Sequence, residues 1–242
     1  MTIIEINKER ILQMNFEVEM KRLDNKEYTD KEIMLIQDLF EDKLVYTAAL
    51  REIQTKVEIL REDFRQSNSY NPIEHIKVRV KQPTSILKKV YIRNIPMDVI
   101  SVKEKLNDIA GVRIVCTFKS DIYKLAEILA RSEDITILEI KDYIANPKPS
   151  GYQSYHMIVE IPVYMATGKR KCKVEIQLRT MAMVFWASLE HKIKYKYDWE
   201  IPQDIKDELY DCSTIVDTLD DKMLALHRRV HNPKEVQAEC CL

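Results

Sequence analysis

The segment 174–180 alternates strictly between apolar and polar side chains. Because successive side chains of a β-strand point to opposite faces, the alternation predicts a strand with one buried face and one polar face. The polar face carries an acid, an amide and a cation about 7 Å apart, which favours a chemical surface over a merely solvated one. These three groups are Glu175, Gln177 and Arg179.

A basic segment lies earlier in the chain, between His75 and Arg93, with six Lys or Arg residues and no acid. Residues 75–81 alternate as a strand does, and a helix is expected from about Pro83, where proline fits the first turn. The cations fit either an exposed edge strand protected by lysines or a clamp for a polyphosphate. The cations on the polar face of the strand are Lys77, Arg79 and Lys81. On the expected helix, Ser85 and Lys89 lie four residues apart on one side.

Glycine is scarce, with only three in the chain: Gly111, Gly151 and Gly168. Glycine-rich phosphate loops need several within a few residues, so both the Walker loop and the dinucleotide fingerprint are excluded. Phosphates would then be held by side-chain cations and a metal ion. Asp108, just before a β-prone run at 109–118, and Glu175 supply two carboxylates, which fits Mg²⁺-dependent phosphoryl chemistry.

Composition limits the class of protein. The chain has 242 residues, 45% of them hydrophobic, enough for one large domain with or without helical extensions. No apolar run approaches the roughly 18 residues of a membrane span, and the N-terminus does not resemble a signal peptide. Five cysteines, an odd number without a CxxC pair, argue against disulfides and a zinc site. We therefore expect a cytoplasmic protein without a membrane partner.

The order of patterns predicts a mixed α/β fold, with a sheet of about five strands flanked by helices. A capping box at Thr29–Glu32 is expected to open a long N-terminal helix. Further helices are expected at 98–106, 120–132 and 181–195. We expect an N-terminal helical arm over 1–74, a core over 75–200, and a C-terminal helix and tail over 201–242. Strands are expected near 75–81, 110–118, 135–143, 153–163 and 170–178.

The final helix has a strict 4-3 seam, which favours coiled-coil-like pairing with another subunit. Packing against the N-terminal helix of the same chain is an equally good interpretation. The seam consists of Ile205, Leu209, Cys212, Val216, Leu219, Met223, Leu226 and Val230.

Five motifs in order give the chain a recognisable likeness over residues 28–230. It resembles the synthetase domain of RelA/SpoT homologues, above all the small alarmone synthetases of the RelQ and RelP type. The resemblance implies a nucleotidyltransferase-like sheet and a GTP pyrophosphokinase that transfers the β,γ-pyrophosphate of ATP to the 3′-hydroxyl of GTP or GDP, giving (p)ppGpp and AMP. The motifs lie at 79–89, 107–113, 142–156, 174–180 and 185–191.

The resemblance also implies roles for individual residues. Asp108 is expected to bind Mg²⁺, and Glu175 to support the metal or take the proton of the 3′-hydroxyl. Tyr152 is expected to stack on guanine, although a loop aromatic folded onto the core is an alternative. His156 fits a substrate contact and a buried core histidine equally well. On the ATP side the resemblance places Arg79, Lys81, Ser85, Lys89 and Arg113, and near GTP or GDP it places Lys148, Tyr152, His156, Gln177 and Arg179.

Two other functions fit the residues less well. One is a nucleotidyltransferase-like enzyme with a different acceptor, and the other is a non-catalytic module that binds RNA or nucleotides. The paired acids Asp108 and Glu175 argue against a pure binder. The sequence has no His-Asp dipeptide, so synthesis without hydrolysis is expected. Small relatives imply a homotetramer built through terminal helices, and regulation by an alarmone or single-stranded RNA is an open expectation.

Overall fold

The computed structural model describes residues 28–67, 70–195 and 201–231. Its centre is a five-stranded mixed sheet in the order β1-β2-β5-β4-β3, in which only the β2–β5 pair is parallel. The expected α/β fold with about five strands is therefore confirmed. The strands are β1 (Ile73–Val80), β2 (Ala110–Cys116), β3 (Thr136–Asp142), β4 (Tyr155–Met165) and β5 (Gly168–Thr180).

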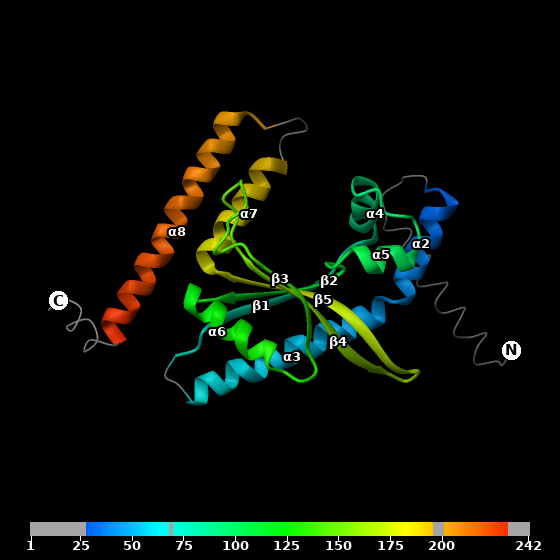
Figure 1. The fold of residues 1–242 in the computed structure, drawn as a ribbon, viewed down its shortest axis with the longest axis horizontal. Helices are drawn as coiled ribbons and strands as arrows, with labels where there is room; N and C mark the ends of the chain where they lie inside the picture. Colours follow the sequence, from blue (N-terminus) through cyan, green and yellow to red (C-terminus); the bar gives the residue numbers. More distant parts are fainter. Residues whose placement is uncertain (1–27, 68–69, 196–200, 232–242) are drawn as a thin grey trace.

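Helices cover the sheet unequally, as Figure 1 shows. The long helix α3 and helix α6 lie along one face, where the main hydrophobic core forms. Helices α7 and α8 stand over one end of the other face, and α2, α4 and α5 gather at the opposite end. The helices are α2 (Asp30–Glu41), α3 (Lys43–Ser67), α4 (Pro83–Ile92), α5 (Val99–Lys105), α6 (Lys119–Ala130), α7 (Met181–Tyr195) and α8 (Gln203–His231).

The N-terminal helical region begins with the expected capping box. The Thr29 hydroxyl accepts from the Glu32 backbone N–H, and the Glu32 carboxylate accepts from the Thr29 backbone N–H. The single long helix expected after it is instead two helices, which meet at Asp42. The Asp42 carboxylate is bound by Lys103 and Arg170, from α5 and β5. These distant partners hold the break, and local sequence patterns do not contain them.

The strand register determines what the polar face of the sheet presents. On the core side, the β5 residues Val174, Ile176 and Leu178 are fully buried. On the other side, the parallel pairing of β2 with β5 sets Gly111 opposite Glu175. The next polar row brings together side chains from all five strands, since residues in register share a face. That row contains Lys77, Arg113, Gln177, His156 and Lys141.

Helix α8 packs against α7 and α6. Leu209, in its first half, is buried, and the Trp186 indole N–H donates to the Leu209 carbonyl oxygen. The second half of the seam is exposed on this chain, which leaves the expected pairing with another subunit untested. None of the described helices is both long and apolar enough to cross a membrane. The exposed seam residues are Leu219, Met223, Leu226 and Val230.

Candidate active site

The polar face of the sheet is hollowed where β1, β2 and β5 run side by side. Every residue that lines the hollow comes from these strands or from the segment that leads into β2. Two carboxylates and three cations share this small space, so opposite charges are concentrated on one surface. The lining residues are Lys77, Arg79, Asp108, Gly111, Val112, Arg113, Glu175 and Gln177.

Asp108 lies at one end of the hollow between two lysines. Lys81, just after β1, and Lys89, on α4, both bind its Oδ2 atom. Burial alone raises the pKa of Asp108, but the hydrogen bonds and charges of the lysines outweigh it and bring the pKa below its usual range. Burial lowers the pKa of Lys81. The carboxylate is thus ionised, and the two ammonium groups exceed its charge by one.

Arginine side chains continue this positive region along the sheet. Arg79 and Arg113 lie in adjacent rows on neighbouring strands. Burial, followed by the charge of Arg179, lowers the pKa of Arg113. The Arg113 Nε atom is buried and has no hydrogen-bond partner among the described residues. A buried donor without an acceptor is costly, and an oxyanion in the hollow would supply one. Ser85, one turn before Lys89, is exposed on α4.

The three polar residues of β5 belong to a closed ring of hydrogen bonds. Gln177 Nε2 donates to Glu175 Oε2 over 2.8 Å, and Arg179 donates to Gln177 Oε1 over 3.1 Å. Arg179 also donates to the Tyr152 hydroxyl. That hydroxyl lies 3.0 Å from His156 Nε2, and His156 Nδ1 lies 3.3 Å from Glu175 Oε1. The ring joins β5, β4 and the loop before β4 into one unit.

The ring has a consistent direction from a cation to an anion. Arg179 has only donors, and the Glu175 carboxylate only accepts. Gln177 on one side, and the Tyr152–His156 pair on the other, therefore accept a hydrogen bond from Arg179 and donate one to Glu175. The tautomer that fits this direction carries its hydrogen on Nδ1 of His156 and accepts from the tyrosine at Nε2. Burial raises the pKa of Glu175, but the bonds from His156 and Gln177 outweigh it and lower that pKa. Glu175 is therefore ionised and fixed in position.

An aromatic and cationic group stands beside the ring. The Lys148 ammonium lies 4.6 Å from the centre of the Tyr143 ring and 4.8 Å from that of Tyr152. The Arg179 guanidinium carbon lies 4.9 Å from the centre of the Tyr152 ring. Such distances suit cation–π attraction. Tyr152 is half-buried rather than folded into the core. Its hydroxyl is held by Arg179 and His156 in the ring of hydrogen bonds.

Two contributors were not among the sequence-predicted site residues. The Ser154 hydroxyl is buried, accepts from Arg179 Nε over 3.2 Å and donates to the Leu178 carbonyl oxygen. The Tyr143 ring meets His156 edge-on, with centroids 5.3 Å apart. Both lie within the segment 142–156, which the motifs marked, but no sequence spacing assigns them a partner. They hold Arg179 and His156 in place.

The carboxylates suit a magnesium ion. Asp108 and Glu175 line the same hollow, and both are ionised. Both lysines donate to Oδ2 of Asp108. No described residue donates a hydrogen bond to its Oδ1 atom, which leaves that oxygen available to a metal ion. Mg²⁺ is usually held by one or two carboxylates plus substrate phosphate and water. The described residues contain no cluster of three or more His, Cys, Asp or Glu side chains placed to hold a metal ion.

Comparison with known proteins places this geometry in a family. Residues 78–200 match the region found in RelA and SpoT proteins. The chain belongs to the RelA/SpoT family. It is 43% identical over 196 residues to the GTP pyrophosphokinase YwaC of Bacillus subtilis, an alignment that covers 81% of this chain and 93% of YwaC. The resemblance inferred from the five motifs is thereby confirmed.

Solved structures of the family share the fold. The crystal structure of small alarmone synthetase 2 from Bacillus subtilis has a TM-score of 0.72 and 44% identity, covering 79% of this chain and 99% of that one. Small alarmone synthetase 1 of the same organism, bound to its product pppGpp, has a TM-score of 0.72 and 36% identity, covering 77% and 95%. The family fold expected from the sequence is thus confirmed.

Proposed function

We propose that this chain is a GTP pyrophosphokinase, which transfers the β,γ-pyrophosphate of ATP to the 3′-hydroxyl of GTP or GDP and releases AMP. The observation that carries the proposal is the ionised Glu175, held beside a hollow that is lined with cations and also contains Asp108. Relatives of similar length carry the same activity in their names. We further propose that residues 75–200 form the catalytic core.

The two substrates are assigned to different parts of the sheet face. Pyrophosphoryl transfer depends on charge neutralisation and alignment more than on covalent catalysis. The ATP phosphates are therefore assigned to the cations beside Asp108. The acceptor nucleotide is assigned to the group around Tyr152, where a guanine base stacks on the ring. The ATP residues are Arg79, Lys81, Ser85, Lys89 and Arg113, and the acceptor residues are Lys148, Tyr152, His156, Gln177 and Arg179.

Glu175 is the proposed proton acceptor. A general base must be ionised when the hydroxyl arrives and must keep its orientation. The bonds from His156 and Gln177 meet both requirements, because they lower the pKa of Glu175 and occupy one lone pair on each of its oxygens. The remaining lone pairs are available to the 3′-hydroxyl proton or to a metal ion.

Magnesium is the proposed cofactor, with Asp108 and Glu175 as its protein ligands. When bound, the ion neutralises phosphate charge and polarises the transferred group. The lysines that bind Asp108 fix the orientation of its carboxylate. They also place positive charge where the phosphates of ATP would lie, so that metal and lysines act on the same group.

Product analysis tests the function directly. The protein is incubated with ATP, Mg²⁺ and one guanine nucleotide at a time, and the products are separated by ion-exchange chromatography. We expect AMP together with a guanosine 3′-pyrophosphate, without subsequent hydrolysis of the product. Transfer to another acceptor would favour a different nucleotidyltransferase-like enzyme. Salt-sensitive RNA affinity without ATP turnover would favour a binding module.

We also propose a cytoplasmic homotetramer assembled through the terminal helices. The support is the exposed apolar seam on the second half of α8, where Leu219 and Met223 are each about half exposed. Free thiols at Cys116, Cys172 and Cys212 fit a reducing compartment. A clean monomer in a sedimentation experiment at micromolar concentration would contradict the assembly.

Regulation by an alarmone or single-stranded RNA is tested by adding each to the activity assay.

A further inference from the structure

A second pocket lies at the other end of β5 from the ring, between α3, α5 and the β4–β5 hairpin. It has a volume of about 160 Å³, which is smaller than the roughly 300–1,000 Å³ of pockets that enclose drug-sized ligands. Its apolar wall is formed by Val45, Leu106 and Ile109. The charged residues around it are Asp42, Glu160, Lys103, Arg170, Lys171 and Lys173.

Positive charge exceeds negative charge around this pocket by two. Lys103 and Arg170 share the single carboxylate of Asp42. Lys171 pairs with Glu160 over 2.7 Å. Among the described residues, Lys173 donates to two neutral acceptors, the Glu104 carbonyl oxygen at 2.8 Å and Asn107 Oδ1 at 3.4 Å. A dianion in the pocket would balance the surplus.

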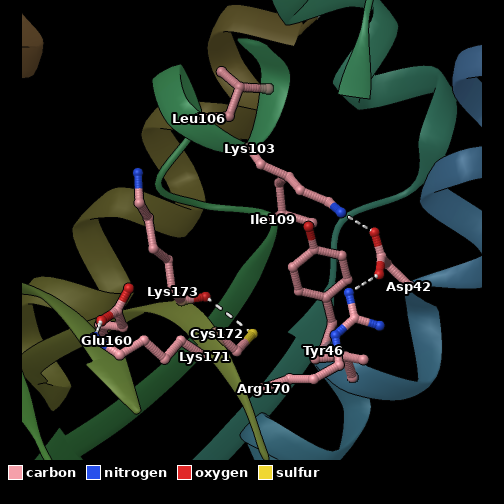
Figure 2. A pocket seen from close by; sticks show the side chains of 11 residues that line it. Asp42, Tyr46, Lys103, Leu106, Ile109, Glu160, Arg170, Lys171, Cys172 and Lys173 are labelled. Atoms are coloured by element: carbon pink, nitrogen blue, oxygen red, sulfur yellow. Dashed lines mark hydrogen bonds and ion pairs between the residues drawn. The ribbon is translucent and has the colours of Figure 1, made fainter. Parts of the chain in front are cut away.

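The Tyr46 side chain is largely buried, and its hydroxyl points into the same space (Figure 2). Tyr46 is only 7% exposed, and among the described residues its hydroxyl has no recorded hydrogen-bond partner. Figure 2 shows the ring standing between Asp42 and Cys172, with the hydroxyl directed toward Lys103 and Ile109. Burial, followed by the charge of Asp42, raises the pKa of Tyr46 above its usual range. The hydroxyl therefore keeps its proton and is available to donate to a group that enters the pocket.

We propose that this pocket binds a compact phosphate-bearing anion, of the size of a phosphate or pyrophosphate group. The Tyr46 hydroxyl donates to one of its oxygens, and Arg170 and Lys173 neutralise its charge. Its volume fits such a group rather than a whole nucleotide. The source is either a free inorganic anion or the terminal phosphates of a larger molecule whose remainder stays outside the pocket.

The pocket adjoins the proposed magnesium ligand. Ile109 in its wall directly follows Asp108, and Lys173 holds Asn107, which directly precedes it. An anion that draws Lys173 toward the pocket loosens this hold and moves Asp108. Occupancy is thus expected to change the synthetase rate. This second part rests on the proposed function, whereas the binding itself does not.

Calorimetric titration with inorganic pyrophosphate tests the binding without turnover. Pyrophosphate is also expected to occupy the active-site hollow, so wild type should show two classes of site. Tyr46→Phe removes only the hydroxyl, and Lys173→Gln removes the charge while keeping a donor. Each should weaken pyrophosphate binding at the pocket beside Tyr46 about tenfold, the loss expected for one charge-assisted hydrogen bond. Lys89→Met should weaken only the binding at the active-site hollow.

Lys169→Gln is the matched control, because Lys169 lies on the same strand and is exposed outside the pocket. It should leave both classes unchanged, and thermal unfolding should show Tyr46→Phe as stable as wild type. Repeating the titration with ADP separates the two sources of the anion. If ADP binds the pocket as tightly as pyrophosphate does, the ligand is the terminal diphosphate of a larger molecule. If ADP binds much more weakly, the ligand is the free anion. A single class of site, unaffected by Tyr46→Phe and Lys173→Gln, overturns the proposal. In the activity assay, Tyr46→Phe should keep the basal rate and lose any response to pyrophosphate.

Discussion

The Nδ1 atom of His156 lies 3.3 Å from Oε1 of Glu175. The other nitrogen of the same imidazole lies 3.0 Å from the Tyr152 hydroxyl. One histidine thus connects the proposed proton acceptor to the proposed guanine platform. A nucleotide that moves Tyr152 would therefore also act on the hydrogen bonds of the carboxylate.

Replacing His156 by phenylalanine should shift the acidic side of the pH–rate profile. Burial raises the pKa of Glu175, and His156 is the strongest influence that opposes it. Without the N–H donor, the pKa of the carboxyl rises. Since the ionised form accepts the proton, activity is present above this pKa and lost below it, so the acidic limb should move to higher pH. His75→Phe, at an exposed position on β1, should leave the profile unchanged, and an equal shift in both variants would contradict the account.

Tyr152 is expected to distinguish the two substrates. Tyr152→Ala removes a stacking platform worth about 1–3 kcal/mol per base, which raises the KM for GTP or GDP roughly 5- to 150-fold. The KM for ATP should change little. Tyr152→Phe keeps the ring but loses the bonds to Arg179 and His156, so it should lower kcat more than it raises KM. Steady-state kinetics with each substrate varied in turn would measure this, with Tyr164→Ala on the exposed hairpin as control. A larger effect on ATP would reverse the assignment of the sites.

Gly151 is expected to tolerate no side chain. It has a φ of +81°, and a Cβ there would overlap the Ser213 hydroxyl on α8. Gly151→Ala should therefore displace the loop that carries Tyr152, lowering both the thermal unfolding temperature and the affinity for the guanine nucleotide. Gly168→Ala is the matched control, since its φ is +113° but nothing lies within 4 Å of the added Cβ. Adding Ser213→Gly to Gly151→Ala should recover part of the affinity, and no recovery would mean that backbone strain alone is responsible.

Asp108→Asn should raise the Mg²⁺ concentration needed for half-maximal rate. The variant removes one of two proposed metal ligands and leaves Lys81 and Lys89 without a counter-ion. Chelation with EDTA should abolish turnover of the wild type. A magnesium titration of the rate provides the measurement, with Asp134→Asn, an exposed partner of Lys56, as control. An unchanged magnesium requirement would remove Asp108 from the metal site.

Local periodicity accounts for most of the fold that was predicted. The strict alternation of 174–180 identified β5 and its polar face, and the β-prone run after Asp108 identified β2. Each of these signals lies within a few residues of the chain. The break between α2 and α3 was not predicted, because its stabilising partners Lys103 and Arg170 are distant in sequence.

The sequence predicted candidate site residues, but it did not predict how they are arranged. No local pattern shows that Arg179 and Glu175 are joined through Tyr152 and His156, since this depends on the register of β4 with β5. The same is true of the two lysines that share Asp108. The pocket beside Tyr46 gave no sequence signal, because its walls come from four separate elements. The assignment of substrates to individual residues stays a prediction.

Glu175→Gln is the decisive variant for the proposed role of Glu175 as proton acceptor. The amide keeps the size of the side chain and cannot accept the proton, and a general base typically contributes about 10²- to 10⁴-fold in rate. Single-turnover rates and nucleotide affinities should be measured together for wild type and variant, at saturating Mg²⁺. We expect a rate loss of about that size with largely unchanged binding of ATP and of the guanine nucleotide. Undiminished turnover would contradict this role.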